Sequence, residues 1–367
     1  MEIEVTQEKF AKALNNVSRI AVGKVTLPVL NNVLIRVNKN KVSLITTNLD
    51  MAITDYLPVS NSKDGVITIP AKLLAEFVSN LPKGEKIKLS SKGEKVTISA
   101  GKYSSIINGS PADDFPELPE IDEKSSVVFK MSINDFKNGI NQVVIASSND
   151  LTRPALTGVY FNTYDNILAI AATDGYRLAE KQLIKNVKSE IKVIVPTTSL
   201  QEVLRAIDED MEEIEISFNE DLIRFRLGEI EIISKIIDGS FPDYQKLIPK
   251  DNNIVINVNR EELVRDTKLA ALFARRSAGG SIVLEAKKPN IFSIRSVASE
   301  LGENDSVVTT EVSEEGKINL NSRFLLDALN VLDEKEINLQ FANRINPIIL
   351  TNKKSKDYTH IIMPLNQ

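Results

Sequence analysis

The chain has 367 residues, of which 42% are hydrophobic and 26% are charged, and its formal net charge is −5. Its length suits roughly two to four domains, and its apolar content excludes a disordered chain. The absence of cysteine excludes a disulfide scaffold, thiolate metal sites and thiol nucleophiles. No stretch approaches the roughly 20 apolar residues of a membrane span, and the acidic, strand-like start is unlike a signal peptide, so we predict a cytoplasmic protein.

The first part of the chain predicts a helix over residues 7–20, a polar loop that ends in Pro28, and strands that continue to Thr54. A second helix, over residues 71–81, follows Pro70, which is tolerated there because the first helical amide has no internal partner. Alternating runs then predict antiparallel strands over residues 86–89, 95–99 and 103–108.

The same order of elements returns in the middle of the chain. A helix is predicted over residues 133–146 and another over 198–208, and strands are predicted over 213–218, 221–227 and 229–237. Pro70 and Pro196 lie 126 positions apart, and Phe115 and Phe241 have the same spacing. Two landmarks at one spacing indicate an internal repeat.

A third, more diverged copy completes the chain. Helices are predicted over residues 259–273 and 322–332, and strands over 336–341, 346–351 and 358–364. We therefore predict three domains, 1–121, 122–251 and 252–367, each with two helices and about eight short strands. Helices on antiparallel sheets define an α+β fold. A constant rotation between such units closes into a ring or opens into a helix, and the periodicity does not choose between them.

The predicted helices are more basic than the rest of the chain. Their six windows together carry +3, whereas the whole chain carries −5. Clustered Lys and Arg would attract DNA phosphates without regard to sequence, although solvated helix faces explain the same charge. Aromatic residues do not alternate with these bases, so stacking platforms for single strands are not indicated.

Motifs of enzyme chemistry are absent from the sequence. His360 is the only histidine and lies in a strand pattern, and there is no nucleophile elbow. Neither a phosphate-binding loop nor a dinucleotide-binding glycine motif occurs. We predict a non-catalytic protein without cofactor or metal.

Five segments in fixed order carry a resemblance: Thr26–Pro28, Ala172–Ala179, Ile194–Pro196, Ile237–Tyr244 and Ile361–Leu365. They resemble the bacterial DNA polymerase III β subunit family, the replicative sliding clamps, over essentially the whole chain. The resemblance implies three tandem DNA-clamp domains, which form half of a six-domain ring. That ring is a head-to-tail homodimer that encircles double-stranded DNA and acts as a processivity factor. A separate ATPase, the clamp loader, places the ring on DNA, in agreement with the missing phosphate loop.

The resemblance also implies a cleft between domains 2 and 3 that binds short peptides of the replicative DNA polymerase, the clamp loader and repair proteins. Six apolar side chains would line this cleft: Leu156, Leu178, Leu247, Ile345, Met363 and Leu365. Arg177 and Lys246 would supply its polar ends. The matching positions are Arg153, Leu156, Thr173, Gly175, Tyr176, Arg177, Leu178, Pro242, Lys246, Leu247, Asn321, Ile345, Met363, Pro364 and Leu365.

The resemblance also points to interface and DNA-contacting positions. Ile107, Leu272 and Phe273 match the dimer interface, and Lys24 and Asn149 match DNA-contacting loops. To these we add, as further DNA-binding candidates, the loop residue Arg153 and the bases of the predicted helices: Lys9, Lys12, Lys137, Arg205, Arg260, Arg265, Lys268 and Arg323.

Two other hypotheses remain open at the level of sequence. One is a repeat scaffold that binds proteins and never encircles DNA. The other is a hydrolase that depends on His360. The sequence does not decide the dimer stability or the preferred peptide.

Overall fold

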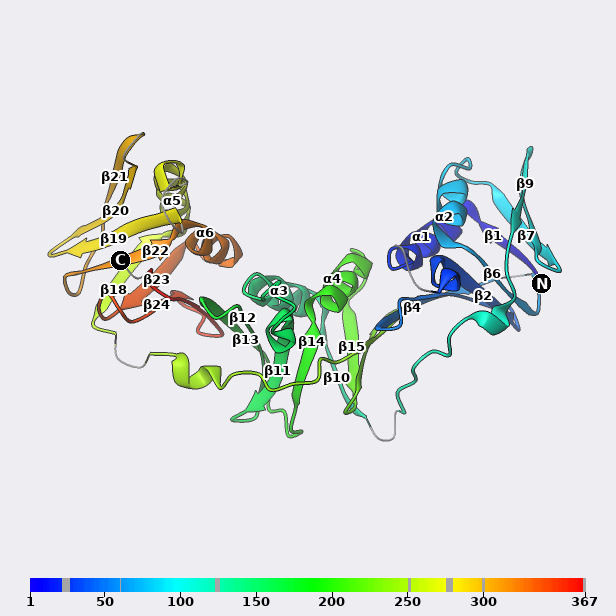
Figure 1. Ribbon diagram of the computed structural model, residues 1–367, viewed down its shortest axis with the longest axis horizontal. Coiled ribbons are helices and arrows are strands. Elements are labelled where there is room, and N and C mark those ends of the chain that lie inside the picture. Colours follow the sequence, from blue (N-terminus) through cyan, green and yellow to red (C-terminus); the bar gives the residue numbers. More distant parts are fainter. Residues whose placement is uncertain are drawn as a thin grey trace. The chain divides into compact units, whose positions relative to one another are not determined.

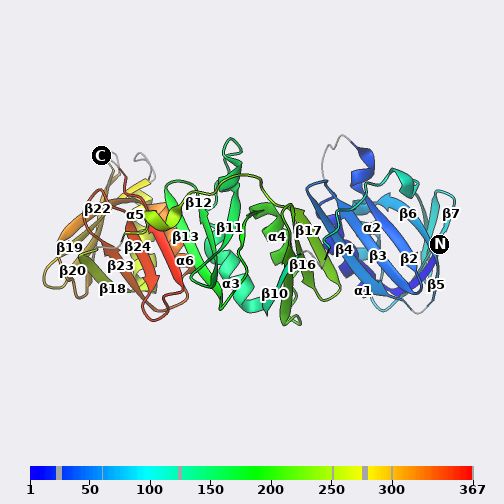
Figure 2. The same ribbon diagram turned by 90° about the horizontal axis from the view of Figure 1, so that it is seen from below.

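The computed structural model describes residues 1–21, 27–59, 61–122, 126–249, 252–274, 280–298 and 301–365. The chain forms two compact units, which we describe separately (Figures 1 and 2). Unit 1 comprises Met1–Ile133 and Thr198–Ile236, and unit 2 comprises Asn134–Thr197 and Ile237–Gln367. No helix in the described ranges combines the length and the apolar composition needed to cross a membrane.

Unit 1 contains two antiparallel sheets. The first has the strand order β5 (Ser62–Lys63), β1 (Glu2–Thr6), β7 (Lys86–Lys92), β8 (Lys95–Ala100), β9 (Tyr103–Asn108). The second has the order β10 (Val127–Ser132), β15 (Glu213–Phe218), β16 (Leu222–Leu227), β17 (Ile230–Lys235), β4 (Met51–Pro58), β3 (Lys41–Thr47), β2 (Asn32–Asn38), β6 (Gly65–Pro70).

Three helices belong mainly to unit 1: α1 (Gln7–Ser18), α2 (Ala71–Ser79) and α4 (Thr197–Ala206). α1 packs against α2 and against strands β3 and β4 (Figure 1). Its apolar residues recur every three or four positions, so Phe10, Leu14 and Val17 form one fully buried stripe. Burial of that stripe fixes the helix on the sheet.

Unit 2 also contains two antiparallel sheets. The larger has the order β14 (Lys192–Pro196), β11 (Gly158–Tyr164), β12 (Ile167–Thr173), β13 (Arg177–Lys185), β25 (Tyr358–Ile362), β24 (Ile348–Asn352), β23 (Glu336–Phe341), β18 (Ile254–Asn259). The smaller has the order β21 (Gly302–Thr309), β20 (Ile291–Ala298), β19 (Ser281–Lys287), β22 (Gly316–Asn321). Its helices are α3 (Ile133–Val144), α5 (Arg260–Ala274) and α6 (Ser322–Val331), and α5 packs against α6 and β20.

The predicted repeat is present in the backbone contacts. The first residue of α1, α3 and α5 donates its amide to a carbonyl just before a later strand in each case. These hydrogen bonds join Gln7 to Glu85 at 3.0 Å, Ile133 to Glu212 at 3.0 Å and Arg260 to Lys335 at 2.7 Å. The 3₁₀ turns Pro28–Asn31 and Pro154–Thr157 also match. All six predicted helices are confirmed, and their ends agree to within two residues wherever they are described.

Each large sheet joins two copies of the repeat through one pair of strands. In unit 1, β4 pairs antiparallel with β17, and Ile53 lies opposite Ile232. In unit 2, β13 pairs antiparallel with β25, and Ala179 lies opposite His360. Continuous sheets therefore cross the joints between repeats. The predicted domain boundaries near 121 and 251 stay predictions.

His360 lies fully buried in β25 and has a structural environment. Its Nδ1 is 2.9 Å from the Tyr358 hydroxyl, which donates to the carbonyl of Gln142 at 3.1 Å. Since that hydroxyl proton is used, the imidazole carries its proton on Nδ1. Its Nε2 has no hydrogen-bond partner among the described residues. Burial lowers the pKa of His360 to about 3.

We predict that His360 makes the protein sensitive to acid. The unfolded chain takes up a proton near pH 6.5 and the folded chain does not, so the contribution of His360 to the free energy of unfolding falls between pH 6.5 and about 3, by up to about 1.4 kcal/mol per pH unit. Urea unfolding between pH 7 and pH 4 measures the slope. His360→Ile should make the slope less steep, because isoleucine takes up no proton. Isoleucine should fit there, since Ile232 fills the matching position of β17. Equal slopes in both proteins would contradict this assignment.

Candidate functional site

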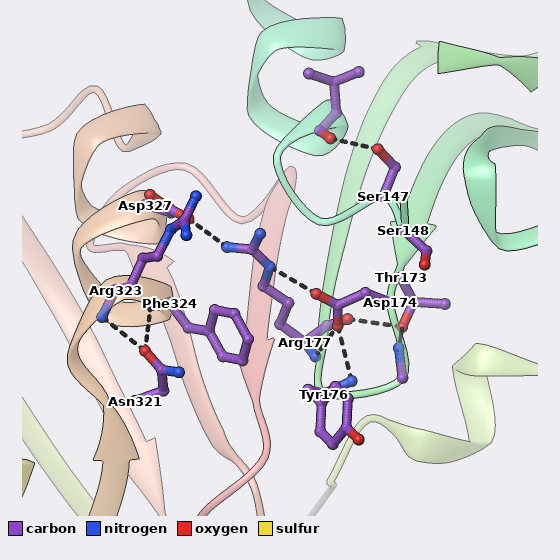
Figure 3. Close-up of polar contacts among 12 residues, drawn as sticks. Ser147, Ser148, Thr173, Asp174, Tyr176, Arg177, Asn321, Arg323, Phe324 and Asp327 are labelled. Atoms are coloured by element: carbon purple, nitrogen blue, oxygen red, sulfur yellow. Dashed lines mark hydrogen bonds and ion pairs between the residues drawn. The ribbon is translucent and has the colours of Figure 1, made fainter. Parts of the chain in front are cut away.

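The turn between β12 and β13 is held by side chains of its own residues (Figure 3). Asp174 Oδ1 accepts hydrogen bonds from the amides of Tyr176 at 2.8 Å and Arg177 at 3.0 Å. The Thr173 hydroxyl donates to the Arg177 carbonyl at 2.7 Å and accepts from the Gly175 amide at 3.1 Å. Gly175 has a φ of 92°, a conformation that disfavours other residues. The turn is therefore rigid and displays Tyr176 to solvent.

The C-terminal segment after β25 is attached to this turn. The Met363 amide donates to the Tyr176 carbonyl at 2.8 Å, and the Leu365 amide donates to the Asn319 carbonyl of β22 at 2.9 Å. The segment Met363–Leu365 thus runs from the turn to the strand that precedes α6. Asn321 caps that helix, since its side chain accepts from the Arg323 and Phe324 amides.

An apolar cluster lies behind the turn. Leu178, Ala171, Tyr244, Ile349 and Ile361 are buried together. Beside them Phe241 stacks on Tyr160 at 4.8 Å between ring centroids. The Tyr244 hydroxyl donates to the buried Glu180 carboxylate at 2.8 Å. Tyr244 begins the short 3₁₀ helix η4 (Tyr244–Leu247), so this bond fixes the position of η4 on the sheet.

Large apolar side chains are exposed on the loops of this region. The exposed fractions are 60% for Leu247, 77% for Ile345, 63% for Tyr176 and 43% for Met363. Met363 and Tyr176 are joined by the backbone hydrogen bond described above, so two of these exposed side chains lie at the same turn. Asn343 accepts hydrogen bonds from the amides of Ile345 and Asn346, and it thereby fixes the loop that presents Ile345.

Charged residues accompany this apolar surface. Lys246 is exposed and pairs with Asp243 at 2.7 Å, and Arg153 pairs with Asp150 at 3.5 Å. Arg177 differs from both, because its side chain is only 11% exposed and bonds to Asp174 and Asp327. Lys246 is therefore accessible to a ligand, whereas Arg177 is engaged inside the protein.

All fifteen residues predicted for the peptide cleft lie in unit 2. Hydrogen bonds or strand pairing directly connect Thr173, Gly175, Tyr176, Arg177, Leu178 and Met363. Arg153 adjoins the turn, because a side chain added to Gly175 would lie 3.7 Å from its guanidinium. Leu156 is buried, Pro242 is exposed, and Pro364 and Leu365 are half-buried. Phe324 and Asp327, which contact Arg177, were not among the predicted cleft residues. Their spacing of three on a predicted helix indicated only that they share one face of it.

The predicted DNA-binding residues divide according to their partners. Lys12 pairs with Asp208 at 2.6 Å, Arg205 with Glu202, and Arg260 donates to the Leu329 carbonyl at 3.2 Å. Arg265 makes only a long contact of 4.0 Å with Asp266. Lys24 lies outside the described residues. The remaining candidates are exposed and have no ion-pair partner in the described ranges: Lys9, Lys137, Asn149, Lys268 and Arg323.

The predicted interface residues differ in exposure. Leu272 is exposed and Phe273 is half-buried on α5. Ile107 is buried in β9, whereas its neighbour Ile106 is 65% exposed. Alternation along the strand places these two side chains on opposite faces.

Nowhere in the described part of the chain do three His, Asp or Glu side chains gather as a metal ion would need. His360 is inaccessible to substrate, which removes the feature on which the hydrolase hypothesis depended.

Comparisons with known proteins agree with this structure over its full length. Sequence models of the DNA polymerase III β subunit match in order: the N-terminal domain over residues 1–119, the central domain over 130–243 and the C-terminal domain over 245–366. The beta sliding clamp of Staphylococcus epidermidis is 30% identical, and the alignment covers 100% of this chain and 99% of the relative.

Solved structures show the same fold. The sliding clamp of Pseudomonas aeruginosa bound to griselimycin has a TM-score of 0.95 and 25% identity, with all of both chains covered. The clamp of Bacillus subtilis has a TM-score of 0.94 and 26% identity, with 100% and 99% covered. The predicted α+β fold of three clamp domains is confirmed. The chain belongs to the DNA polymerase III β subunit family, the sliding clamps, which serve DNA replication as processivity factors and not as catalysts.

Proposed function

We propose that two copies of this chain pair head to tail into a ring that encircles double-stranded DNA and tethers partner proteins to it. The observation that carries this proposal is the strand pairing at the joints between repeats. β4 with β17 and β13 with β25 are the same joint in two places. The third repeat supplies β21, and the first supplies β9, and each ends its own sheet. These two strands are the remaining members of the same joint.

Hydrogen bonds to the helices identify β21 as the third copy of β4. The Thr46 hydroxyl of β3 donates to the Val17 carbonyl of α1, and the Ser296 hydroxyl of β20 donates to the Ala270 carbonyl of α5. Ile53 lies opposite Thr46 on β4, and Asn304 lies opposite Ser296 on β21. Asn304 therefore holds the place of Ile53.

The partner strand follows in the same way. Ser105 of β9 lies opposite the buried Ile98 of β8, as Ile232 of β17 lies opposite the buried Phe225 of β16. Since Ile232 faces Ile53, we propose that Ser105 of one chain faces Asn304 of the other. Antiparallel addition would satisfy the outer backbone groups of both edge strands.

Exposed apolar residues near both edges support an interface. Tyr103 and Ile106 on β9 and Val307 on β21 are largely exposed. Glu303 and Asp305 of β21 are acidic, while Lys102 precedes β9. Burial of these apolar side chains and attraction between these charges would stabilise the pairing of unlike ends. Pairing of unlike ends closes a ring when the rotation per chain fits.

The peptide cleft is the second part of the proposal. The exposed Leu247, Ile345 and Met363, with Lys246 beside them, would receive apolar side chains of a short peptide from the replicative polymerase, the clamp loader or a repair protein. The rigid turn at Asp174 lowers the entropy cost of that binding. The protein would act in the cytoplasm, where these partners replicate DNA.

DNA would be held by unpaired bases of the helices, without sequence specificity. Lys9 is the clearest candidate of α1, because Lys12 on the same face is already paired with Asp208. Phosphate contacts require accessible cations, so the other unpaired bases of the helices, Lys137, Lys268 and Arg323, complete this set.

Retention on circular DNA tests the function. Loaded by the clamp loader of the same organism, the protein should stay on a nicked circle and leave when the circle is cut into a linear molecule. Gel filtration of labelled protein with the DNA measures this. Encirclement would be contradicted if the protein left intact circles as fast as cut ones, or if it persisted on linear DNA with free ends. Either result would favour a protein scaffold.

Two substitutions test the assignment of the α1 bases. DNA affinity falls with salt concentration, and Lys9→Ala should make the fall of its logarithm against the logarithm of salt concentration shallower by about one. Asp208→Asn should make that fall steeper by about one, because it frees Lys12 to contact a phosphate. Anisotropy of a labelled linear duplex across salt concentrations measures both. Unchanged slopes in both variants would place α1 away from the DNA.

A further inference from the structure

Arg177 is held by Asp174 of its own turn and by two residues of the distant helix α6, Phe324 and Asp327. Its Nε bonds to Asp174 Oδ2 at 3.1 Å and its Nη1 to Asp327 Oδ2 at 2.6 Å. The guanidinium carbon Cζ lies over the Phe324 ring, 4.5 Å from its centroid (Figure 3). A planar, permanently charged guanidinium suits this combination of ion pairs and stacking, and lysine would not.

The two residues on α6 form one binding edge for Arg177. Phe324 and Asp327 are three positions apart on a helix, so they project from the same face. Arg177 therefore connects the turn after β12 with α6. The Asp174 pair is largely shielded from water, whereas Asp327 is partly exposed, so the second pair is partly screened by solvent.

These contacts close a frame around the candidate cleft. The frame runs from the turn through Met363 and Leu365 to Asn319, continues through the Asn321 cap into α6, and returns through Asp327 to Arg177. Seven predicted cleft residues lie on the frame or in its turn: Thr173, Gly175, Tyr176, Arg177, Asn321, Met363 and Leu365. The link between Arg177 and α6, to which Asp327 contributes the ion pair, is made by side chains alone, whereas the other links involve backbone groups.

We propose that Asp327 is a positioning residue for peptide binding, acting through Arg177 and Phe324; this inference rests on the proposed cleft. With Asp327 intact, Arg177 is oriented away from solvent, the Phe324 ring is fixed beneath it, and the turn that carries Tyr176 keeps its distance from α6. Without that carboxylate, Asp174 is the remaining ion-pair partner of Arg177, and no ion pair connects the turn with α6. The cleft would then lose its pre-formed shape, and binding would have to order it.

The test compares Asp327→Asn with the unaltered protein. The probe is a fluorescein-labelled apolar peptide of about ten residues from the replicative polymerase of the same organism. We expect roughly tenfold weaker binding by anisotropy, which corresponds to 1.4 kcal/mol. Asp327→Glu should restore much of the affinity, which a purely steric effect would not allow. The melting temperature should change little, since Asp327 is partly exposed.

Two further variants complete the design. Asp238→Asn removes the same charge from an exposed position of unit 2 and should bind the peptide normally. In a cycle with Arg177→Met, the double variant with Asp327→Asn should lose less affinity than the two single losses combined. Normal binding by Asp327→Asn, equal weakening by Asp238→Asn, or full additivity would each overturn the positioning role. If the unaltered protein bound no such peptide, the proposed cleft itself would fail.

Discussion

Strand pairing across the joints between repeats is the interaction on which the rest of this structure depends. A repeat of helices on a sheet has two open edges, and unpaired backbone groups at an edge invite another strand. The chain satisfies two such edges internally, through β4 with β17 and β13 with β25. The proposed peptide cleft depends on the second joint, because β25 carries the chain past the turn at Tyr176 and leaves Met363 beside it.

The two joints share a backbone pattern but differ in their side chains. The Lys235 amide bonds to the Asp50 carbonyl at 2.8 Å in unit 1, as the Met363 amide bonds to the Tyr176 carbonyl in unit 2. Among the described residues, the Asp174–Arg177–Asp327 contacts belong to the second joint alone. The shared backbone pattern reflects the repeat, whereas these side-chain contacts distinguish the joint that carries the candidate site.

Much of the fold could be predicted from sequence because the helices are marked by periodic apolar residues and by a repeated spacing. Pro70 and Pro196 directly precede the helices α2 and α4, which were predicted behind them. Long-range pairing is different in kind. Nothing local to Arg177 reveals Asp327, 150 positions away, and charge counts could not show that Lys12 is paired with Asp208. Site residues could therefore be named by resemblance, but their partners required coordinates.

A cysteine pair across the proposed seam tests the ring most directly. The chain contains no cysteine, so Ser105→Cys with Asn304→Cys introduces the only two thiols. Residues directly opposite on paired strands lie within the distance that a disulfide spans. Mild oxidation should give a single denaturation-resistant species of twice 40.7 kDa, closed at both seams. Uncrosslinked monomer, or a ladder of longer species, would contradict a closed ring of two chains.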